Sequence, residues 1–382
     1  MQYTKLKDIN EYVSISINPM KLPNTMFEMY SVPIYETGHP EYLSGNEIGS
    51  NKVIVKKNDV LLCKINPRIN RVWVVSDESE HQSIASSEWI VIRSNTYNPE
   101  FLAWYFRCPK FKKLMISEVT GIGGSLTRAQ PKAVAEYPVP VLSIDEQEKI
   151  VGVLNKVNSI IGARKRELQK LDELIRARFV DMFGSIHDNK YGYEIQTIQD
   201  VCEQIKDGTH QTPTYTEDSL NGFKFLSSKD VTSGKIDWNH LKYIPESLHT
   251  ELYARIAPKK GDLLLAKNGT TGIAAIVDRD EIFDIYVSLA LLRPIEIDSI
   301  YLWGAVNSQE TKKQFDASLK GIGVPNLHLG EIKKTRIIVP PILKQKEFAA
   351  FVAQVDKSKA VIQKSLDEMQ LLFDSLMQQY FG

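Results

Sequence analysis

The sequence predicts a mixed α/β (α+β) fold in which two related domains stand in tandem, each followed by a long helix. Three observations lead to this prediction. Short sequence runs recur about 200 positions apart. Strand-like and helix-like runs alternate within each half, and the stretches 145–183 and 342–381 read as long helices. We expect the two long helices to form an antiparallel coiled coil with pseudo-twofold symmetry.

The internal repeat is visible in several matched runs. Val-Thr-Gly-Ile-Gly at 119–123 reappears as Leu-Lys-Gly-Ile-Gly at 319–323, and Asp-Val-Leu-Leu at 59–62 reappears as Asp-Leu-Leu-Leu at 262–265. Phe-Gly closes both halves. The offset between matched runs drifts, which indicates insertions and deletions between two related halves.

Each half opens with strand-like runs, marked by alternation and β-branched residues between Asn and Gly turns. In the first half these runs are Lys52–Lys56, Asp59–Ile65, Arg71–Val75 and Trp89–Arg93, followed by a helix near 99–115. In the second half they are Asp262–Ala266, Ile273–Val277 and Tyr286–Leu292, followed by a helix near 299–316. The expected boundaries are domain one at 1–143, a central helix at 144–184, domain two at 185–341 and a C-terminal helix at 342–382.

The long helices share an apolar seam. Its residues recur every three or four positions in one register, which favours a coiled coil over the alternative, a surface helix of one globular domain. Asp145, with Glu148 three residues later, can cap the first helix, and Ser143 is another candidate. The seam residues expected to bind a partner are Leu154, Val157, Ile161, Leu168, Leu171 and Ile175, then Val352, Val355, Ile362, Leu366, Met369 and Phe373.

Charged residues interrupt the seam at Arg164, Arg178 and Lys359. Single charges in a seam lower stability but fix register and partner, so we expect helices from another protein to complete the bundle. An antiparallel pair about 58 Å long would hold two recognition heads apart. That scale suits DNA half-sites spaced by ~34 Å or multiples of it, and heads of different sequence should read different half-sites.

Composition excludes several classes of protein. Lys plus Arg number 47 and Asp plus Glu number 47, so the chain is not a uniformly basic DNA binder. Three distant cysteines give neither a disulfide framework nor a zinc site. The N-terminus lacks the apolar core of a signal peptide, and no apolar run is long enough to span a membrane. We expect a cytoplasmic protein.

Catalytic motifs are missing from the sequence. It contains no phosphate-binding loop of the GxxxxGK[ST] type, no Asn-Pro-Pro-Tyr, no HExxH and no GxSxG. The seven histidines show no metal-ligand spacing. We therefore name no catalytic residue and no metal ligand.

Candidate DNA-binding residues lie in turns that follow strand-like runs. Arg suits guanine edges, Asn suits adenine edges, and Lys suits phosphate or guanine, although a solvated polar turn is the alternative in each case. Domain one supplies Lys64, Asn66, Arg68, Asn70, Arg71, Ser125, Thr127 and Arg128. Domain two supplies Thr209, His210, Gln211, Lys267, Asn268, Thr270, Thr271, Asn326 and His328.

Several stretches resemble the specificity subunits of type I restriction-modification systems. They are DGTHQTP at 207–213, FLSSKDV at 225–231, GDLLLAKNG at 261–269 and NDVLLCKINPRINRV at 58–72, together with the two Phe-Gly helix ends. The resemblance covers essentially the whole chain. It rests on loose motifs and on the more specific duplicated arrangement of domain plus helix.

The resemblance implies a non-catalytic subunit whose two target-recognition domains read one bipartite, asymmetric DNA site. The paired helices would set the spacer and dock two methyltransferase subunits, which hold S-adenosylmethionine and methylate adenine N6. Two restriction subunits, which use ATP and Mg, would complete a translocating nuclease. One departure from the family is that recognition domain one begins at once, so we expect little preceding segment to pack beside the C-terminal helix.

Three other functions compete with this one. A stand-alone pseudo-dimeric DNA-binding regulator would bind its site tightly without partner subunits. An enzyme carrying its own recognition domains would need a catalytic motif. A coiled-coil scaffold would bind proteins alone. Because neither half is strongly basic, we expect specificity from a few loop cations, and much of the phosphate contact from partner subunits.

Overall fold

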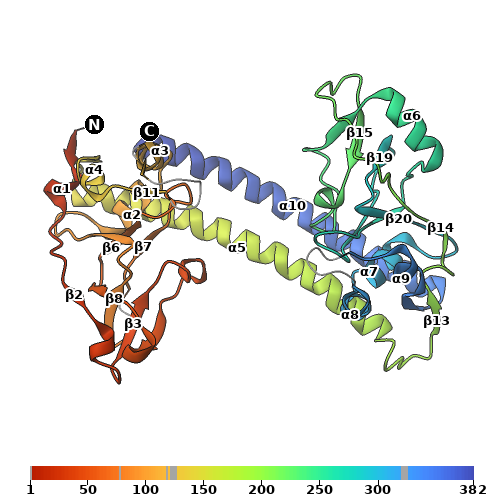
Figure 1. The fold of residues 1–382 in the computed structure, drawn as a ribbon, viewed down its shortest axis with the longest axis horizontal. Coiled ribbons are helices and arrows are strands. Elements are labelled where there is room, and N and C mark those ends of the chain that lie inside the picture. Colours follow the sequence, from red (N-terminus) through yellow and green to blue (C-terminus); the bar gives the residue numbers. More distant parts are fainter. Residues whose placement is uncertain (1, 77–78, 118, 121–126, 320–325) are drawn as a thin grey trace. The chain divides into compact units, whose positions relative to one another are not determined.

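A computed structural model describes residues 2–76, 79–117, 119–120, 127–319 and 326–382 (Figure 1). The fold is mixed α/β, and the chain divides into two compact units. Unit 1 comprises Met1–Lys165 with Ser365–Gly382, and unit 2 comprises Arg166–Lys364. Each long helix therefore contributes one part of its length to each unit.

The main sheet of unit 1 has the strand order β2-β5-β8-β3-β4, in which β3 and β8 are parallel. An antiparallel sheet has the order β7-β6-β9, and β1 pairs with β12 and β10 with β11. The strands are β1 Tyr3–Lys5, β2 Ser16–Ile17, β3 Met26–Tyr30, β4 Glu41–Ser44, β5 Lys52–Ile54, β6 Val60–Cys63, β7 Val72–Val74, β8 Gln82–Ala85, β9 Trp89–Ile92, β10 Val119–Thr120, β11 Arg128–Ala129 and β12 Pro138–Pro140. The helices are α1 Leu6–Ile9, η1 Pro19–Lys21, η2 Tyr35–Thr37, η3 Gly45–Glu47, α2 Pro99–Arg107, α3 Pro109–Ser117, α4 Pro131–Ala135 and the first half of α5 Ile144–Phe183.

The main sheet of unit 2 is antiparallel, with the order β14-β20-β17-β18. A second sheet has the order β16-β15-β19, in which β15 and β19 are parallel, and β13 pairs with β21. The strands are β13 Glu194–Thr197, β14 Cys202–Asp207, β15 Phe223–Leu226, β16 Lys242–Ile244, β17 Leu263–Ala266, β18 Ala274–Ile276, β19 Phe283–Ile285, β20 Leu289–Pro294 and β21 Arg336–Val339. The helices are η4 Ser228–Asp230, α6 Glu246–Arg255, α7 Ser299–Val306, α8 Gln309–Ser318, α9 Leu329–Lys334 and α10 Ile342–Phe381, most of whose second half belongs to unit 1.

Strands β6 and β17 are apolar along their whole length because both of their faces are buried. In β6, Val60 and Leu62 join the core that includes α2, whereas Leu61 joins the opposite core with Trp89. In β17, Leu263 and Leu264 enter two different cores in the same way. Alternate residues of a strand point to opposite faces, so a strand covered on both sides needs a continuous apolar run.

The helix expected near 99–115 is instead two helices, α2 and α3. Pro109 has no backbone N–H and cannot continue a helix from α2, but it is well placed as the first residue of α3. The helix expected near 299–316 is also two helices. Here the side chain of Ser308 accepts a hydrogen bond from the backbone N–H of Thr311 and caps a new helix, α8.

Helix α5 is capped by Ser143. The Ser143 hydroxyl accepts from the Glu146 backbone N–H at 3.3 Å, and the Glu146 carboxylate accepts from the Ser143 N–H at 2.9 Å, which is a capping box. The Ser143 hydroxyl also donates to the Glu146 carboxylate at 2.7 Å, and this bond, together with the one from the Ser143 N–H, lowers the pKa of Glu146 from its ordinary value. Asp145, the first candidate from the sequence, lies inside the first turn, so the second candidate was right.

The long helices pack into the cores of both units. In unit 1, Leu154 of α5 and Met377 and Phe381 of α10 lie in one cluster with α2. In unit 2, Phe179 of α5 and Phe348 of α10 lie in one cluster with α7. A buried glutamine fixes the start of each helix. Gln147 accepts from the Asn98 N–H, and Gln345 accepts from the Asp298 N–H, both at 2.8 Å.

Candidate nucleic-acid interface

In unit 2, several strands end at one edge of the main sheet. Asp207, the last residue of β14, and Leu265, next to last in β17, both lie opposite Ala290 near the start of β20. The chain segments that leave this edge carry most of the candidate residues of domain two. The fold therefore brings the turn after β14 and the turn after β17 together.

The turn after β14 is attached to β19 through its backbone. The Thr209 N–H donates to the Ile285 carbonyl at 3.0 Å, and the Val287 N–H donates to the Thr209 carbonyl at 2.9 Å. A Cβ at Gly208 would lie 2.0 Å from the Ile285 carbonyl oxygen, so this position requires glycine. Thr209 is only 6% exposed. Its side chain is thus part of the framework of the turn.

The carboxylate of Asp207 joins the two turns. Its Oδ2 lies 2.9 Å from Lys267 Nζ and 3.1 Å from His210 Nε2. Burial alone would raise the pKa of Asp207, but the hydrogen bonds and charges of Lys267 and His210 outweigh burial and lower it. The Lys267 side chain is 7% exposed, so its ammonium is held in a buried ion pair with Asp207.

The turn after β17 contains a mixture of internal and exposed groups. Asn268 forms a β-bridge with Asn326, and the Leu327 N–H donates to the Lys267 carbonyl at 2.9 Å. Thr270 is exposed and Thr271 is half-buried. His328 is exposed, and its carbonyl accepts from the first turn of α9.

Unit 1 has a turn of comparable construction after β6. The Lys64 N–H donates to the Glu88 carbonyl at 3.0 Å, and the Asn66 N–H donates to the Thr127 carbonyl at 2.8 Å. Asn66 and Asn70 have φ values of 49° and 55°, a left-handed conformation that Asn tolerates better than most residues. The two Asn residues therefore shape this turn through their backbones.

The arginines of this turn differ in their exposure. Arg68 is exposed, whereas the Arg71 side chain is 17% exposed, with its Nε 3.9 Å from Glu36. Arg128 is exposed and pairs with Glu88, with Nε–Oε2 at 3.2 Å. Lys64 Nζ donates to the Ser87 carbonyl at 2.6 Å. Arg68 is thus the cation of this turn that is most open to a ligand.

Burial separates the expected DNA-binding residues into two sets. Thr127, Thr209 and Lys267 are 8%, 6% and 5% exposed, so the expectation that their side chains face DNA does not fit the structure. The residues exposed at the two edges are Arg68, Arg128, His210, Gln211, Thr270 and His328. Half-buried ones are Lys64, Asn66, Asn70, Arg71, Asn268, Thr271 and Asn326. Ser125 lies outside the described residues.

Seven of the twelve seam residues are buried, so in this structure they offer little surface to an expected partner. The buried ones, at 0–9% exposure, are Leu154, Val157, Ile161, Ile175, Val352, Val355 and Leu366. The remaining seam residues, Leu168, Leu171, Ile362, Met369 and Phe373, are half-buried. The exposed large apolar side chains of the same helices are Ile144, Val153, Leu174, Val180, Ile342, Leu343, Val361, Leu371 and Leu372. These exposed residues were missed because they fall outside the heptad pattern.

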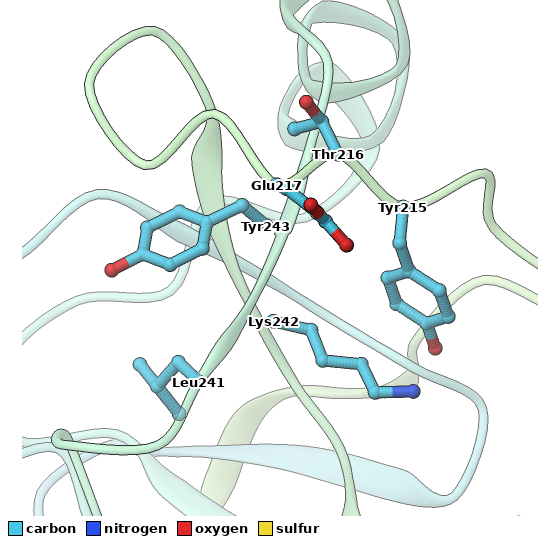
Figure 2. A pocket seen from close by; sticks show the side chains of 6 residues that line it. All are labelled: Tyr215, Thr216, Glu217, Leu241, Lys242 and Tyr243. Carbon is cyan, nitrogen blue, oxygen red and sulfur yellow. The ribbon is translucent and has the colours of Figure 1, made fainter.

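Sequence reasoning also missed an open pocket in unit 2, between the segment 215–217 and strand β16 (Figure 2). Its volume is about 450 Å³, and it is lined by Tyr215, Thr216, Glu217, Leu241, Lys242 and Tyr243. Lys242 Nζ lies 4.0 Å from the Tyr215 ring centroid, a cation–π contact. Because the Thr216–Tyr243 bridge that forms the pocket is non-local, no short sequence motif marks it.

Other kinds of site receive no support in the described part of the chain. No group of three or more His, Cys, Asp or Glu residues there is arranged to hold a metal ion. Cys63, Cys108 and Cys202 are buried free thiols. Neither long helix, nor any shorter described helix, has an apolar stretch that could cross a bilayer.

Comparison with known proteins gives consistent matches. A family model described as the type I restriction modification DNA specificity domain matches residues 191–370. The type I restriction enzyme MjaVIII specificity subunit of Methanocaldococcus jannaschii is 22% identical over 85% of this chain and 78% of its own length. The EcoBI specificity subunit of Escherichia coli is 20% identical over 76% of this chain and 65% of its own length.

Two solved structures share the fold. One comes from work on complex assembly and conformational transition of the type I restriction-modification system. It has a TM-score of 0.59 and 18% identity, and the match covers 100% of this chain and 97% of that one. The other is the type I restriction-modification S subunit of M. genitalium, with a TM-score of 0.55, 11% identity, and coverage of 100% and 96%.

Proposed function

Because the chain belongs to the family of type I restriction-modification specificity subunits, we propose that its two domains read the two halves of one bipartite, asymmetric DNA site. The chain is a DNA sequence-recognition subunit and is not itself catalytic. Recognition is proposed to take place at the edges where β6 ends in unit 1 and where β14 and β17 end in unit 2.

One observation carries this proposal. Both units hold the same backbone frame at this edge but present different side chains on it. The Lys64 N–H donates to the carbonyl of the residue before β9, and the Lys267 N–H donates to that of the residue before β20. The carbonyl of each lysine accepts from the segment that precedes α4 or α9. Arg68 is exposed in one turn, and Thr270 is exposed in the other. A shared frame with different polar groups is the arrangement expected of two readers of different sequences.

The proposed tandem repeat is supported by matched contacts in the two units. Strand β6 pairs with β7 and β9, as β17 pairs with β18 and β20. The Asp59–Arg93 ion pair has a counterpart in Asp262–Arg293. The proposed boundaries remain 1–143, 144–184, 185–341 and 342–382, and the bounds of α5 and α10 support them.

We propose that α5 and α10 form an antiparallel coiled coil that sets the spacer between the half-sites. Within unit 2, Asp172 of α5 is ion-paired with Lys359 of α10, and Arg178 lies over the ring of Phe351 at 5.8 Å. Contacts that advance along one helix while they retreat along the other support an antiparallel pairing.

Two methyltransferase subunits are the proposed partners of this coiled coil. Two restriction subunits would bind in addition to form a nuclease. The exposed apolar side chains of α5 and α10 are the proposed contacts, in place of the buried seam. S-adenosylmethionine would then be bound by the methyltransferase subunits, and ATP and Mg by the restriction subunits. This chain would contribute specificity alone.

The test is to express the chain with its neighbouring methyltransferase subunit and map methylated adenines across the host genome. We expect one bipartite, asymmetric motif with a fixed spacer. Exchange of residues 185–341 for the second domain of a relative should change only one half of that motif. Tight site-specific binding by the isolated chain, with no association with the methyltransferase subunit, would instead favour a stand-alone DNA-binding regulator.

A further inference from the structure

We propose that Arg255 is a positioning residue that holds the turn 207–211 in the shape needed to read DNA, and that His210 and Gln211 are its reading groups. The inference rests on the proposed function, because it presumes that this turn faces DNA. It goes further by assigning separate tasks to the residues of the turn and by adding a residue far away in the sequence.

Arg255, the last residue of α6, fixes the start of the turn. Its Nη2 donates to the carbonyl oxygens of Asp207 and Gly208, at 2.7 Å and 2.6 Å. The Arg255 carbonyl in turn accepts from Lys206 Nζ at 3.4 Å. A guanidinium is planar, so the two hydrogens of Nη2 have fixed directions, and two adjacent carbonyls that accept from them leave the turn little freedom.

Helix α6, which carries Arg255, is itself held against β19 by a buried contact. His249 Nδ1 lies 2.7 Å from Asp284 Oδ2, and their side chains are 12% and 1% exposed. The His249 ring stacks on Phe223 with centroids 3.7 Å apart. The next residue of β19, Ile285, accepts the Thr209 N–H. Neighbouring residues of one strand therefore hold both α6 and the turn.

Two side chains of the turn remain exposed to a ligand, those of His210 and Gln211. Asp207 is occupied by Lys267, and the Thr209 side chain is buried. The His210 side chain is 68% exposed, and its contact with Asp207 orients the imidazole. Gln211 is exposed, and its backbone N–H is held by the Thr209 hydroxyl at 3.2 Å. A glutamine amide is complementary to the major-groove edge of adenine, so we assign Gln211 to an A·T pair.

The experiment measures DNA binding by the complex with its methyltransferase subunits. Fluorescence anisotropy is recorded on duplexes that vary one base pair at a time in the half-site of unit 2. Gln211→Ala should lower the discrimination between the preferred and the other base pairs by about tenfold at one A·T position. His210→Ala should lower it at that position or at the neighbouring one. Arg255→Ala should lower discrimination at these same pairs and nowhere else. The matched control is Arg279→Ala, an exposed arginine of unit 2 paired with Asp278.

A double-mutant cycle separates positioning from a general structural effect. If Arg255 acts through Gln211, the double variant should lose little more discrimination than Gln211→Ala alone. If Arg255→Ala lowers the melting temperature of unit 2, Arg255→Met, which keeps an apolar stem but has no donor, replaces it in the cycle. Additive losses, or equal weakening at every base pair, would overturn the positioning role.

Failure of this inference can be told from failure of the proposed function. If His210→Ala and Gln211→Ala leave discrimination unchanged at every position, the turn does not read DNA, and both the reading role and its positioning by Arg255 are wrong. If they change it but Arg255→Ala and Arg255→Met do not, only the role of Arg255 is wrong. The methylation map tests the wider function independently of either result.

Discussion

Arg93 holds the buried carboxylate of Asp59 at two points, with Nε–Oδ1 and Nη2–Oδ2 distances of 2.7 Å each. The Asp59 side chain is fully buried, and its Oδ2 also accepts the Lys56 N–H at 2.9 Å. The hydrogen bonds from Arg93 to the Asp59 carboxylate raise the pKa of Arg93. The ion pair ties the turn before β6 to the end of β9, and Asp262 with Arg293 does the same in unit 2.

Replacement of Asp59 should therefore destabilise unit 1 strongly. Asp59→Ala leaves the guanidinium and the Lys56 N–H without their acceptor, and loss of one member of a buried pair costs about 3–5 kcal/mol. Urea unfolding followed by tryptophan fluorescence measures the change. The control is Glu136→Gln at an exposed pair with Lys5 and Lys7, where we expect little effect. Equal effects of the two substitutions would contradict this prediction.

The second prediction concerns the buried glutamine at the start of α10. Gln345 is 2% exposed, accepts from the Asp298 N–H at 2.8 Å and donates to the Pro340 carbonyl at 2.7 Å. Gln345→Ala leaves both backbone groups unpaired, at a cost of about 1–3 kcal/mol. Hydrogen exchange should show lost protection at the Asp298 amide, whereas Gln370→Ala, on the exposed face of α10, should leave it protected.

The third prediction is a pH dependence set by Asp207. Its pKa is lowered in the folded state, because Lys267 and His210 outweigh the effect of burial. A lowered pKa adds stability above the unfolded value of about 3.9, and that stability is lost as pH falls through the folded pKa. In Lys267→Met, only His210 remains to oppose the effect of burial on the Asp207 carboxylate, so the pKa of Asp207 should rise.

The stability difference between the wild-type chain and Lys267→Met should thus be largest near neutral pH and shrink as pH falls below about 4. Urea unfolding of unit 2 at a series of pH values measures it. Lys229→Met, at an exposed lysine of the same unit, is the control. A difference that stays constant with pH would show that Lys267 contributes through packing alone.

The fourth prediction separates two arginines of unit 1. Arg68 is exposed, whereas Arg71 is largely buried near Glu36. Arg68→Ala should relax specificity in one half-site, by about 1–3 kcal/mol, with normal folding. Arg71→Ala should lower the melting temperature of unit 1. Anisotropy on single-base variants and thermal unfolding test the two effects, and the half-site of unit 2 serves as an internal control. Equal weakening of both half-sites by Arg68→Ala would identify a phosphate contact instead.

Local sequence patterns predicted the elements that depend on local physics. The long helices follow from proline-free heptads, and β6 and β17 follow from short apolar runs. The parallel pairing of β3 with β8 was missed, because its partners lie far apart in the sequence and neither has a continuous apolar run. The same limit applies at the candidate site. Lys267 looked like a free cation until the fold placed Asp207 beside it, and Arg255 had no mark in the sequence at all.

The last prediction concerns the surface that we propose to bind methyltransferase subunits. The seam residue Leu366 is 9% exposed, whereas Val361 and Leu371 of the same helix are each 71% exposed. An exposed apolar side chain gains by burial against a partner and loses little in the free chain when it is replaced. Val361→Asp and Leu371→Asp should therefore keep the helical circular dichroism of the chain but weaken assembly with the methyltransferase subunit, measured by size-exclusion chromatography with light scattering. Leu366→Asp should lower helix content as well, because it places a charge in the core. Ser358→Asp adds the same charge at an exposed polar position of α10 and should leave assembly intact. Normal assembly by both Val361→Asp and Leu371→Asp would place the docking surface elsewhere on the molecule.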